Sequence, residues 1–421
     1  MEFIITYGTL LLVLIGFLFL LLVRGVCCHG IISSDIRLID KLVVIALFLR
    51  IVWACFVCYL SNFGYAYFVY DDEGYSLFAS GIINENSLQG VNGYYYFLRF
   101  MYVVFGRTTL TGRAINLFFS VAVLYPLAIL EKLLCGEKRY YSTKFFACSP
   151  FMIFISFFEI KDIIVMFLFV SSYVLVKFLQ DRFNLWALIF LFVFCASNET
   201  FRSGSGVLPI VVLALNAPKL LNVNRNVKWL LHIMSISFLV VVGVYVGRDY
   251  ILQQADRVDG YQNWIVTQFA SSSIYSSLVV TSMADIWKFP FCFLLYALQP
   301  VNIYQGSMRY FTEYGLYAKF VDAPILFFSI LLLPIYIKKE KWDSLLFVFM
   351  YSFTACINLT NARQGFFLYP IMYLIFFDGL ATLASLERKN RFAKMCCNRV
   401  IGKMFIAASY ILWFAFVLHR T

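Results

Sequence analysis

Apolar stretches long enough to cross a lipid bilayer recur along this chain, and short polar segments separate most of them. Hydrocarbon offers backbone N–H and C=O groups no hydrogen-bonding partner, so a segment that crosses it forms a helix. Hydrophobic residues make up 62% of the 421 positions and charged residues only 14%, which excludes a chain of soluble domains. We therefore predict an all-α fold: a single integral membrane domain over residues 1–421, built as a polytopic transmembrane helical bundle.

The pattern predicts about 12 spans. The first stretch lacks the basic segment and the small-residue cleavage site of a signal peptide, so we expect a retained helix. The apolar segments 94–106 and 287–300 are shorter, and we expect them to lie along the surface or to re-enter the membrane. The candidate spans are residues 3–23, 41–62, 114–134, 143–158, 163–180, 184–198, 204–216, 228–247, 318–337, 343–359, 366–386 and 403–419.

Lys and Arg residues orient such a bundle, because loops rich in them stay on the cytoplasmic side. The loops predicted to share one side hold 21 basic residues, and the longer loops on the other side hold 12. The first long loop, residues 63–113, and a second one, residues 248–315, are therefore expected to face outward. These loops also account for the net charge of +11, which is not a sign of nucleic-acid binding.

Three consecutive carboxylates, Asp71-Asp72-Glu73, stand in the first outer loop, in a stretch without Lys or Arg from Ser61 to Tyr96. We call them the acidic run. Like charges repel, so a fold that keeps them together usually has a use for them. Aromatic residues crowd both sides of the run, as they do at a membrane–water interface. A solvated acidic loop is the plain alternative.

Further charged residues are predicted on the outer side, at the ends of other spans. Charges at the edge of a membrane need water or a partner, and they often mark the path of a substrate. Taken singly, each could instead be a solvated loop charge or part of a local ion pair. They are Glu159, Lys161, Asp162, Arg202, Arg309 and Arg363.

Motifs of soluble enzymes are missing from the sequence: there is no phosphate-binding loop, no HExxH zinc motif and no nucleophile elbow. Cys27-Cys28 and Cys396-Cys397 have neither the spacing nor the His partners of a metal site. We expect no metal, no disulfide and no cofactor.

Short motifs follow one another along most of the chain. They are Asp71-Asp72-Glu73-x-Tyr75, the Tyr-rich residues 94–97, Arg113-x-x-Asn116, Ser149-Pro150, Lys161-Asp162, the turn at Arg202, Phe289-Pro290, Leu298-Gln299-Pro300 and Asn361-x-Arg363. This order resembles the GT-C-type membrane glycosyltransferases, and among them the Wzy-type polymerases of bacterial O-antigen and other surface polysaccharides. Two features differ: Gly93-Tyr94-Tyr95-Tyr96 replaces the family's Tyr-Pro-Pro, and one additional span precedes the acidic loop.

The resemblance implies a glycosyltransferase of lipopolysaccharide or other polysaccharide biosynthesis. It would lie in the bacterial inner membrane with its active site facing the periplasm. Its donor and acceptor would be oligosaccharides linked to a polyprenyl (undecaprenyl) phosphate or diphosphate. Membrane lipids and a chain-length regulator protein are the other partners it implies, and nucleic acid is not one.

Sugar transfer from such a donor needs a base for the acceptor hydroxyl and positive charge for the departing phosphate. Asp71 or Asp72 is our candidate base, with Glu73 supporting it or contacting the acceptor. Lys161, Arg202 and Arg363 are the candidates for the phosphate, and Arg309, Glu159 and Asp162 are further substrate-binding candidates. Tyr75 belongs to the aromatic residues that could stack on a sugar or anchor the chain at the interface.

Two other functions fit the same sequence. A GT-C transferase could add a single sugar from polyprenyl phosphate. A flippase for lipid-linked oligosaccharides would also have many spans, but it tends to carry charges within them. Here the predicted spans are nearly free of charge, with Arg50 and Lys177 as exceptions. A purely structural membrane subunit would leave the outer ionisable groups unexplained.

Overall fold

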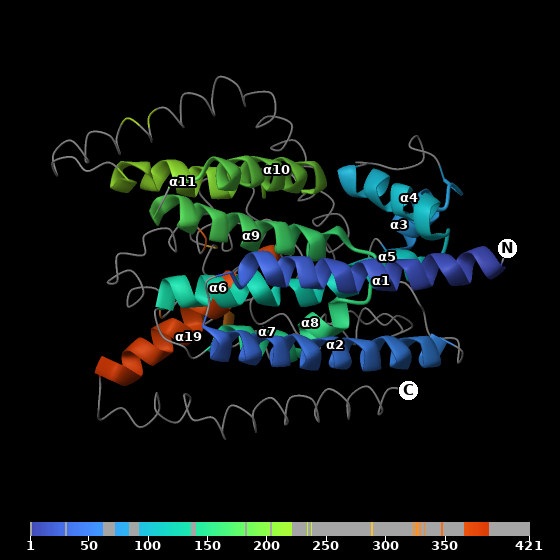
Figure 1. Ribbon diagram of the computed structural model, residues 1–421, viewed down its shortest axis with the longest axis horizontal. Coiled ribbons are helices and arrows are strands. Elements are labelled where there is room, and N and C mark those ends of the chain that lie inside the picture. The colour runs from blue at the N-terminus through green and yellow to red at the C-terminus, as the bar shows by residue number, and fades with distance from the viewer. Residues whose placement is uncertain are drawn as a thin grey trace.

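The computed structural model describes residues 2–29, 32–61, 72–83, 92–135, 140–181, 183–202, 204–220 and 366–386, with isolated positions between 234 and 347. Across these ranges the chain is helical, without a β-strand. Four helical stretches there are long and apolar enough to cross a membrane: Leu10–Cys27, Ser33–Tyr59, Leu110–Cys135 and Lys161–Asp181. They run alongside one another in Figure 1. The prediction of an all-α bundle with several apolar, membrane-length helices is confirmed for this part of the chain.

The first two helices are longer than the sequence predicted. Helix α1 covers Glu2–Cys27 and α2 covers Ser33–Ser61, against predicted spans of 3–23 and 41–62. The first two turns of α2 are polar, and an apolar pattern cannot mark them. Asp35 lies in the first turn of α2, where the positive end of the helix dipole stabilises a negative charge.

The next two predicted spans are each formed by two helices. Helices α5 (Thr109–Ala122) and α6 (Leu124–Cys135) continue one another, with Val123 between them in helical conformation. Helices α7 (Tyr141–Cys148) and α8 (Pro150–Ile155) are separated by a real break. Ser149 is extended there, because the residue before a proline avoids the helical region. Its hydroxyl accepts a hydrogen bond from the Met152 N–H at 3.3 Å and so caps α8.

The remaining described helices follow the predicted spans 163–180, 184–198, 204–216 and 366–386. They are α9 (Lys161–Asp181), α10 (Leu185–Phe201), α11 (Val207–Leu220), η3 (Phe366–Leu368) and α19 (Tyr369–Leu386). The predicted spans 228–247, 318–337, 343–359 and 403–419 lie outside the described residues, isolated positions apart. So do the segment 287–300 and, except for Lys288, the second outer loop 248–315.

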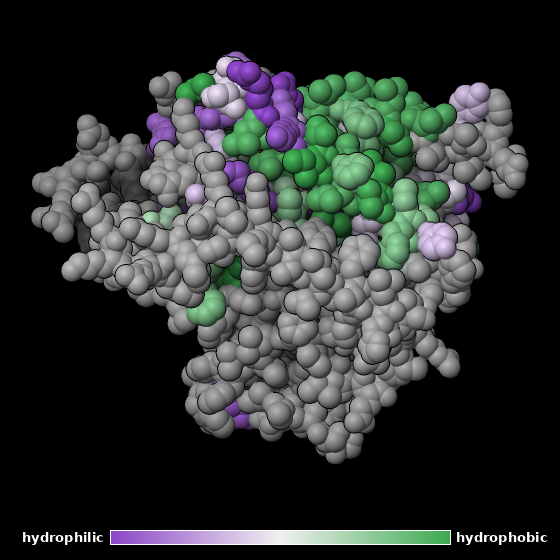
Figure 2. Space-filling model, turned by 90° about the horizontal axis from the view of Figure 1, so that it is seen from below, coloured by the Kyte–Doolittle hydropathy of each residue, from purple (hydrophilic) through white to green (hydrophobic). Residues whose placement is uncertain are grey.

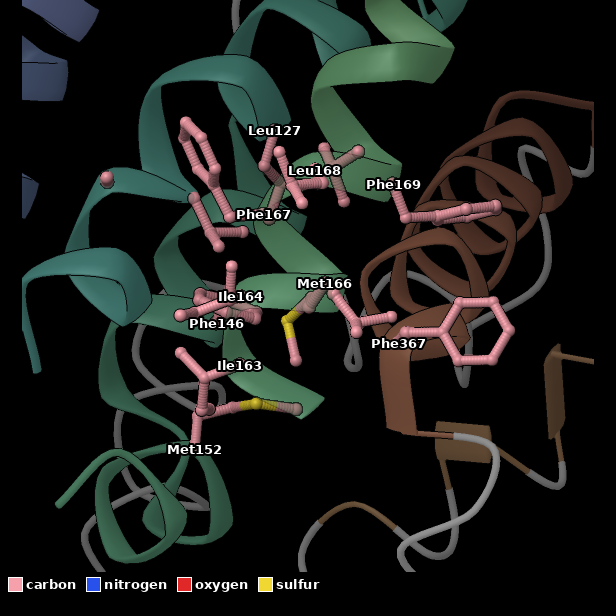
Figure 3. Close-up of a cluster of buried hydrophobic side chains, with 14 of the residues drawn as sticks. Leu127, Phe146, Met152, Ile163, Ile164, Met166, Phe167, Leu168, Phe169 and Phe367 are labelled. Carbon is pink, nitrogen blue, oxygen red and sulfur yellow. The ribbon is translucent and has the colours of Figure 1, made fainter. Parts of the chain in front are cut away.

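Helix α9 lies at the centre of the described helices. Figure 3 shows its side chains meeting others from α6, α7, α8 and η3. The labelled buried residues there are Leu127, Phe146, Met152, Ile163, Ile164, Met166, Phe167, Leu168, Phe169 and Phe367. The first two helices are less buried: most apolar side chains of α1 are exposed, and α2 also exposes several, among them Val44, Phe48 and Ile51. Figure 2 shows a broad apolar area on one side of the molecule, as expected of a surface in contact with lipid.

The acidic loop contains two short helices, α3 (Asp72–Ala79) and α4 (Gly93–Phe105). Both lie at the end of the bundle where α1 begins, and we call this the α3–α4 end (Figure 1). The Asn92 side chain accepts a hydrogen bond from the Tyr94 N–H at 3.0 Å and so caps α4. Helix α4 ends at Gly106, whose φ of 113° suits glycine.

Helix α4 rests on α1 through a close backbone approach at Gly8. A Cβ atom added at Gly8 would overlap the carbonyl oxygen of Phe105. We expect Gly8→Leu to separate the two helices and to lower stability by about 1–3 kcal/mol, the usual effect of overpacking. Thermal unfolding in detergent measures this, with Gly25→Leu as the control, because an added Cβ at Gly25 has open space around it. Equal unfolding temperatures for the two variants would contradict the contact.

Candidate functional site

Two residues of the acidic run form the first turn of α3. Asp72 is the first residue of this helix, and Glu73 follows with an exposed side chain. Carboxylates at this position are favoured by the helix dipole, which offsets some of their mutual repulsion. Asp71 lies outside the described residues. The acids expected in a loop therefore stand, in part, on a helix end.

Helix α3 docks on α4 through aromatic rings. Tyr75 is 2% exposed, and its ring centroid lies 4.8 Å from that of Tyr94 and 4.4 Å from that of Tyr95. Phe78 packs against Tyr95 and Tyr96 in the same way. Such edge and tilted ring contacts stabilise a pair beyond the area they bury. Tyr75, a candidate for stacking on a sugar, therefore packs α3 onto α4 in this structure.

A buried carboxylate, Glu159, lies in the turn between α8 and α9 and joins this assembly. The Tyr102 hydroxyl of α4 donates a hydrogen bond to Glu159 Oε1, and the Ser76 hydroxyl of α3 lies 3.3 Å from the Tyr102 oxygen. All three side chains are buried. Burying a carboxylate is unfavourable unless it is hydrogen-bonded, and Tyr102 supplies such a bond. We call Ser76, Tyr102 and Glu159 the Glu159 relay.

Helix α5 holds the turn that carries Glu159. The Asn116 amide nitrogen donates hydrogen bonds to the carbonyl oxygens of Phe158 and Ile160, the bond to Ile160 being 2.8 Å long. These bonds fix the backbone on both sides of Glu159. One turn earlier on α5, Gly112 leaves room for the carboxylate, because a Cβ there would overlap Glu159 Oε1. The position of Glu159 thus depends on two α5 residues that carry no charge.

Arg202 and Asp162 form an ion pair between the α10–α11 turn and the start of α9. The Arg202 Nη1 atom donates to Asp162 Oδ1, and the side chains are 14% and 2% exposed. The Arg202 guanidinium also lies over the Phe367 ring, 5.3 Å from its centroid. The preceding residue, Phe201, packs its ring 6.1 Å from that of Tyr94. Aromatic contacts therefore connect this ion pair with α3.

The α10–α11 turn that carries Arg202 is itself closed by a carboxylate. Glu199 accepts hydrogen bonds from the backbone N–H groups of Gly204 at 2.7 Å and Gly206 at 3.1 Å. An added Cβ at Gly206 would overlap the Cys195 carbonyl oxygen, so the turn needs glycine there. In this structure Glu199 therefore stabilises the α10–α11 turn through these two hydrogen bonds.

A second cation, Arg113, is completely buried near the start of α5, next to Gly112. Its guanidinium lies over the rings of Phe157 and Phe158, 5.2 and 5.8 Å from their centroids, which is cation–π geometry. The turn of Glu159 therefore receives positive charge from α5 as well. Sequence reasoning noticed Arg113 only within the Arg113-x-x-Asn116 motif.

Most of the predicted site residues that the structure describes gather at the α3–α4 end. Glu73 is exposed there, Tyr75 and Glu159 are buried, Asp162 pairs with Arg202, and Lys161 begins α9 with a partly exposed side chain. Arg309 and Arg363 lie outside the described residues, as does Asp71. Tyr102, Ser76, Asn116 and Gly112 were not predicted as site residues. Asn116 stands in the Arg113-x-x-Asn116 motif, but nothing in the sequence distinguishes the other three.

A separate polar group lies inside the bundle. Asp322 is fully buried and accepts hydrogen bonds from the Tyr373 hydroxyl of α19 and from the Ser149 hydroxyl, the latter at 3.1 Å. Arg50 of α2 is also fully buried and donates to the Ala147 carbonyl at 3.2 Å, close to the break at Ser149. An acid inside a predicted span is a recognised signal of function, and by that signal the sequence could have singled out Asp322.

Two ion pairs lie at the opposite end of the described bundle. Arg24 makes two hydrogen bonds to Asp40, at 2.8 and 2.9 Å, and Lys132 lies 3.7 Å from Asp35. Burial, and then the nearby Asp35 carboxylate, raise the pKa of Tyr140 above its ordinary value. The two ion pairs join α1 to α2 and α2 to α6, so we assign this end a structural role.

In the ranges that the structure describes, no three His, Cys, Asp or Glu side chains are arranged to hold a metal ion. Comparison of the chain with protein-family models, curated proteins and solved structures finds no match.

Proposed function

We propose that this chain is a membrane glycosyltransferase that uses sugars linked to polyprenyl phosphate or diphosphate. In this proposal it is a GT-C-like protein of about 12 spans in a bacterial inner membrane, with the α3–α4 end facing the periplasm. Its most specific form is a polymerase that joins repeat units of a surface polysaccharide. Four candidate spans and the helical structure of the described residues agree with such a fold, and the family resemblance of the motifs adds the chemistry.

One observation carries the proposal: aromatic contacts join a helix that bears two acids to a turn that bears an arginine at one end of an apolar bundle. Helix α3 brings Asp72 and Glu73, and Tyr94 contacts both Tyr75 of α3 and Phe201, next to Arg202. Sugar transfer from a lipid phosphate needs both kinds of group where the membrane meets water.

The proposed reaction exchanges one bond at the anomeric carbon of the donor. An acceptor hydroxyl oxygen bonds to that carbon while its bond to the phosphate oxygen breaks. The hydroxyl proton passes to Asp71 or Asp72, and the electron pair leaves with the polyprenyl phosphate or diphosphate. Arg202, with Lys161, would stabilise the charge on the phosphate, because a guanidinium and an ammonium group both donate charge-assisted hydrogen bonds to phosphate oxygens. In this scheme Asp162 holds the guanidinium in place.

Two buried ionisable residues, Arg50 and Asp322, favour a second candidate, a flippase for lipid-linked oligosaccharides. Both side chains are fully buried, Arg50 within α2 and Asp322 at an isolated described position inside the predicted span 318–337, and transporters place ionisable groups in such surroundings. Each already has partners that suit a structural role, since Ser149 and Tyr373 bind Asp322, and Ser120 accepts from Arg50 at 2.9 Å. We therefore rank this function second.

Deletion of the gene separates these functions through the surface polysaccharide, resolved by chain length on a gel. Loss of a polymerase should leave single repeat units on the surface and no ladder, because units that have crossed the membrane can still be passed on. Loss of a flippase should leave no repeat unit at all. Loss of a transferase of one sugar should leave the ladder, with each rung lighter by that sugar. A ladder of unchanged mass would refute all three.

A further inference from the structure

Helix α3 needs an anchor to hold its acids in place. It has eight residues, fewer than an isolated helix needs for stability in water. Its apolar contacts with α4 are ring against ring, and ring stacks alone allow small shifts. The polar contact from Ser76 to Tyr102 is directional, and Ser76 lies one helical turn after Asp72. A shift at Ser76 would therefore move the start of the helix.

The Glu159 relay has a defined direction when Glu159 is ionised. A carboxylate only accepts hydrogen bonds, so the single Tyr102 proton is committed to Glu159 Oε1. The Tyr102 oxygen then accepts from Ser76, which fixes the donor in a contact that the distance alone leaves open. A bond to a charged acceptor in a buried site is stronger than one between neutral groups.

The far end of the relay is held firmly. Asn116 donates hydrogen bonds to the carbonyl oxygens of Phe158 and Ile160, on either side of Glu159. Gly112 has no side chain, so the Glu159 carboxylate can lie directly against α5. A continuous line of contacts therefore runs from α5 through Glu159 and Tyr102 to Ser76 on α3. In that line, Tyr102 contacts both the carboxylate and the acid-bearing helix.

We propose that Tyr102 is a positioning residue, which ties the acid-bearing helix α3 to the fixed carboxylate of Glu159. It sets where Asp72 and Glu73 stand relative to the membrane end of the bundle. That this position matters for sugar transfer rests on the proposed function. The tie between α3 and Glu159 does not, and it can be measured separately.

The first measurement uses Ala79→Cys as a reporter of docking. Ala79 lies on α3 and is 2% exposed, so a water-soluble maleimide should react with a thiol there only when α3 moves away from α4. The other reactive cysteines are replaced. Tyr102→Phe keeps the ring and removes the hydroxyl, and we expect it to speed labelling roughly 10-fold, as suits loss of a bond to a charged group. Tyr141→Phe, at the other end of the bundle, is the control and should leave the rate unchanged.

A second variant, on α5, perturbs the Glu159 relay at its carboxylate end. Gly112→Ala should displace the Glu159 carboxylate and speed labelling at Ala79→Cys as Tyr102→Phe does. Gly25→Ala is its control, because an added methyl group there meets nothing within 4 Å. Unchanged labelling in both Tyr102→Phe and Gly112→Ala overturns the proposal.

The last measurement is sugar transfer by membrane vesicles supplied with polyprenyl-linked oligosaccharide extracted from the deletion strain. A misplaced base slows the chemical step, so Tyr102→Phe should lower kcat about 10-fold and leave the half-saturating donor concentration unchanged. A change confined to KM would overturn the positioning role. Faster labelling combined with no transfer by the unaltered chain would support the tie and refute the proposed function instead.

Discussion

Replacing Asp72 at the start of α3, or Asp71 just before it, should abolish the polymer while the protein still inserts in the membrane. Asp71→Asn and Asp72→Asn keep the size of the side chain and remove the base. We expect at least one of them to lower polymer formation about 100-fold or more, the usual contribution of a general base. Glu73→Gln should have a smaller effect, because Glu73 is exposed at the helix start and is proposed to support the base. The measurement is the polysaccharide ladder of a deletion strain complemented with each variant.

Two controls make this result specific. Asp181→Asn removes an exposed carboxylate at the far end of α9 and should leave the ladder intact. The amount of each variant in the membrane is measured with an epitope tag, so that loss of product is not loss of protein. A normal ladder from both Asn variants and from the double variant would exclude Asp71 and Asp72 as the base.

Several helices of the described residues could be predicted because a long apolar run favours a helix in lipid. The predicted spans 163–180 and 366–386 correspond closely to α9 and to η3 with α19. The prediction was wrong where a local backbone rule acts within an apolar stretch. The span 143–158 is two helices, because Pro150 forces Ser149 out of helical conformation and apolar counting ignores that.

Only the charged residues of the candidate site could be predicted from the sequence. The acidic run, Asp162 and Arg202 attract attention because charge is rare in an apolar chain. The groups that hold them are common neutral residues, and Tyr102, Asn116 and Gly112 act through contacts with residues 42–57 positions away. Such contacts depend on how the helices pack. Periodicity in one sequence carries no information about them.

Arg202→Ala should destabilise the protein as well as inactivate it. Asp162 is 2% exposed and would be left buried without the guanidinium that now binds it. Removing one partner of a buried ion pair costs about 3–5 kcal/mol, because the other charge is left buried. Thermal unfolding in detergent measures this loss. Arg202→Lys should recover part of the stability and less of the activity, since an ammonium group lacks the planar fork that fits both a carboxylate and a phosphate.

The double variant Arg202→Ala with Asp162→Asn separates the two roles of Arg202. Asn fills the same space without a charge, so the double variant should regain much of the stability that Arg202→Ala loses. If Arg202 also contacts the donor phosphate, polymer should remain absent, because no guanidinium is left to stabilise the departing charge. Asp162→Asn alone keeps the guanidinium and should retain part of the ladder. A full ladder from the double variant would mean that Arg202 only neutralises Asp162, and the phosphate site would then have to be sought at Lys161 or Arg363.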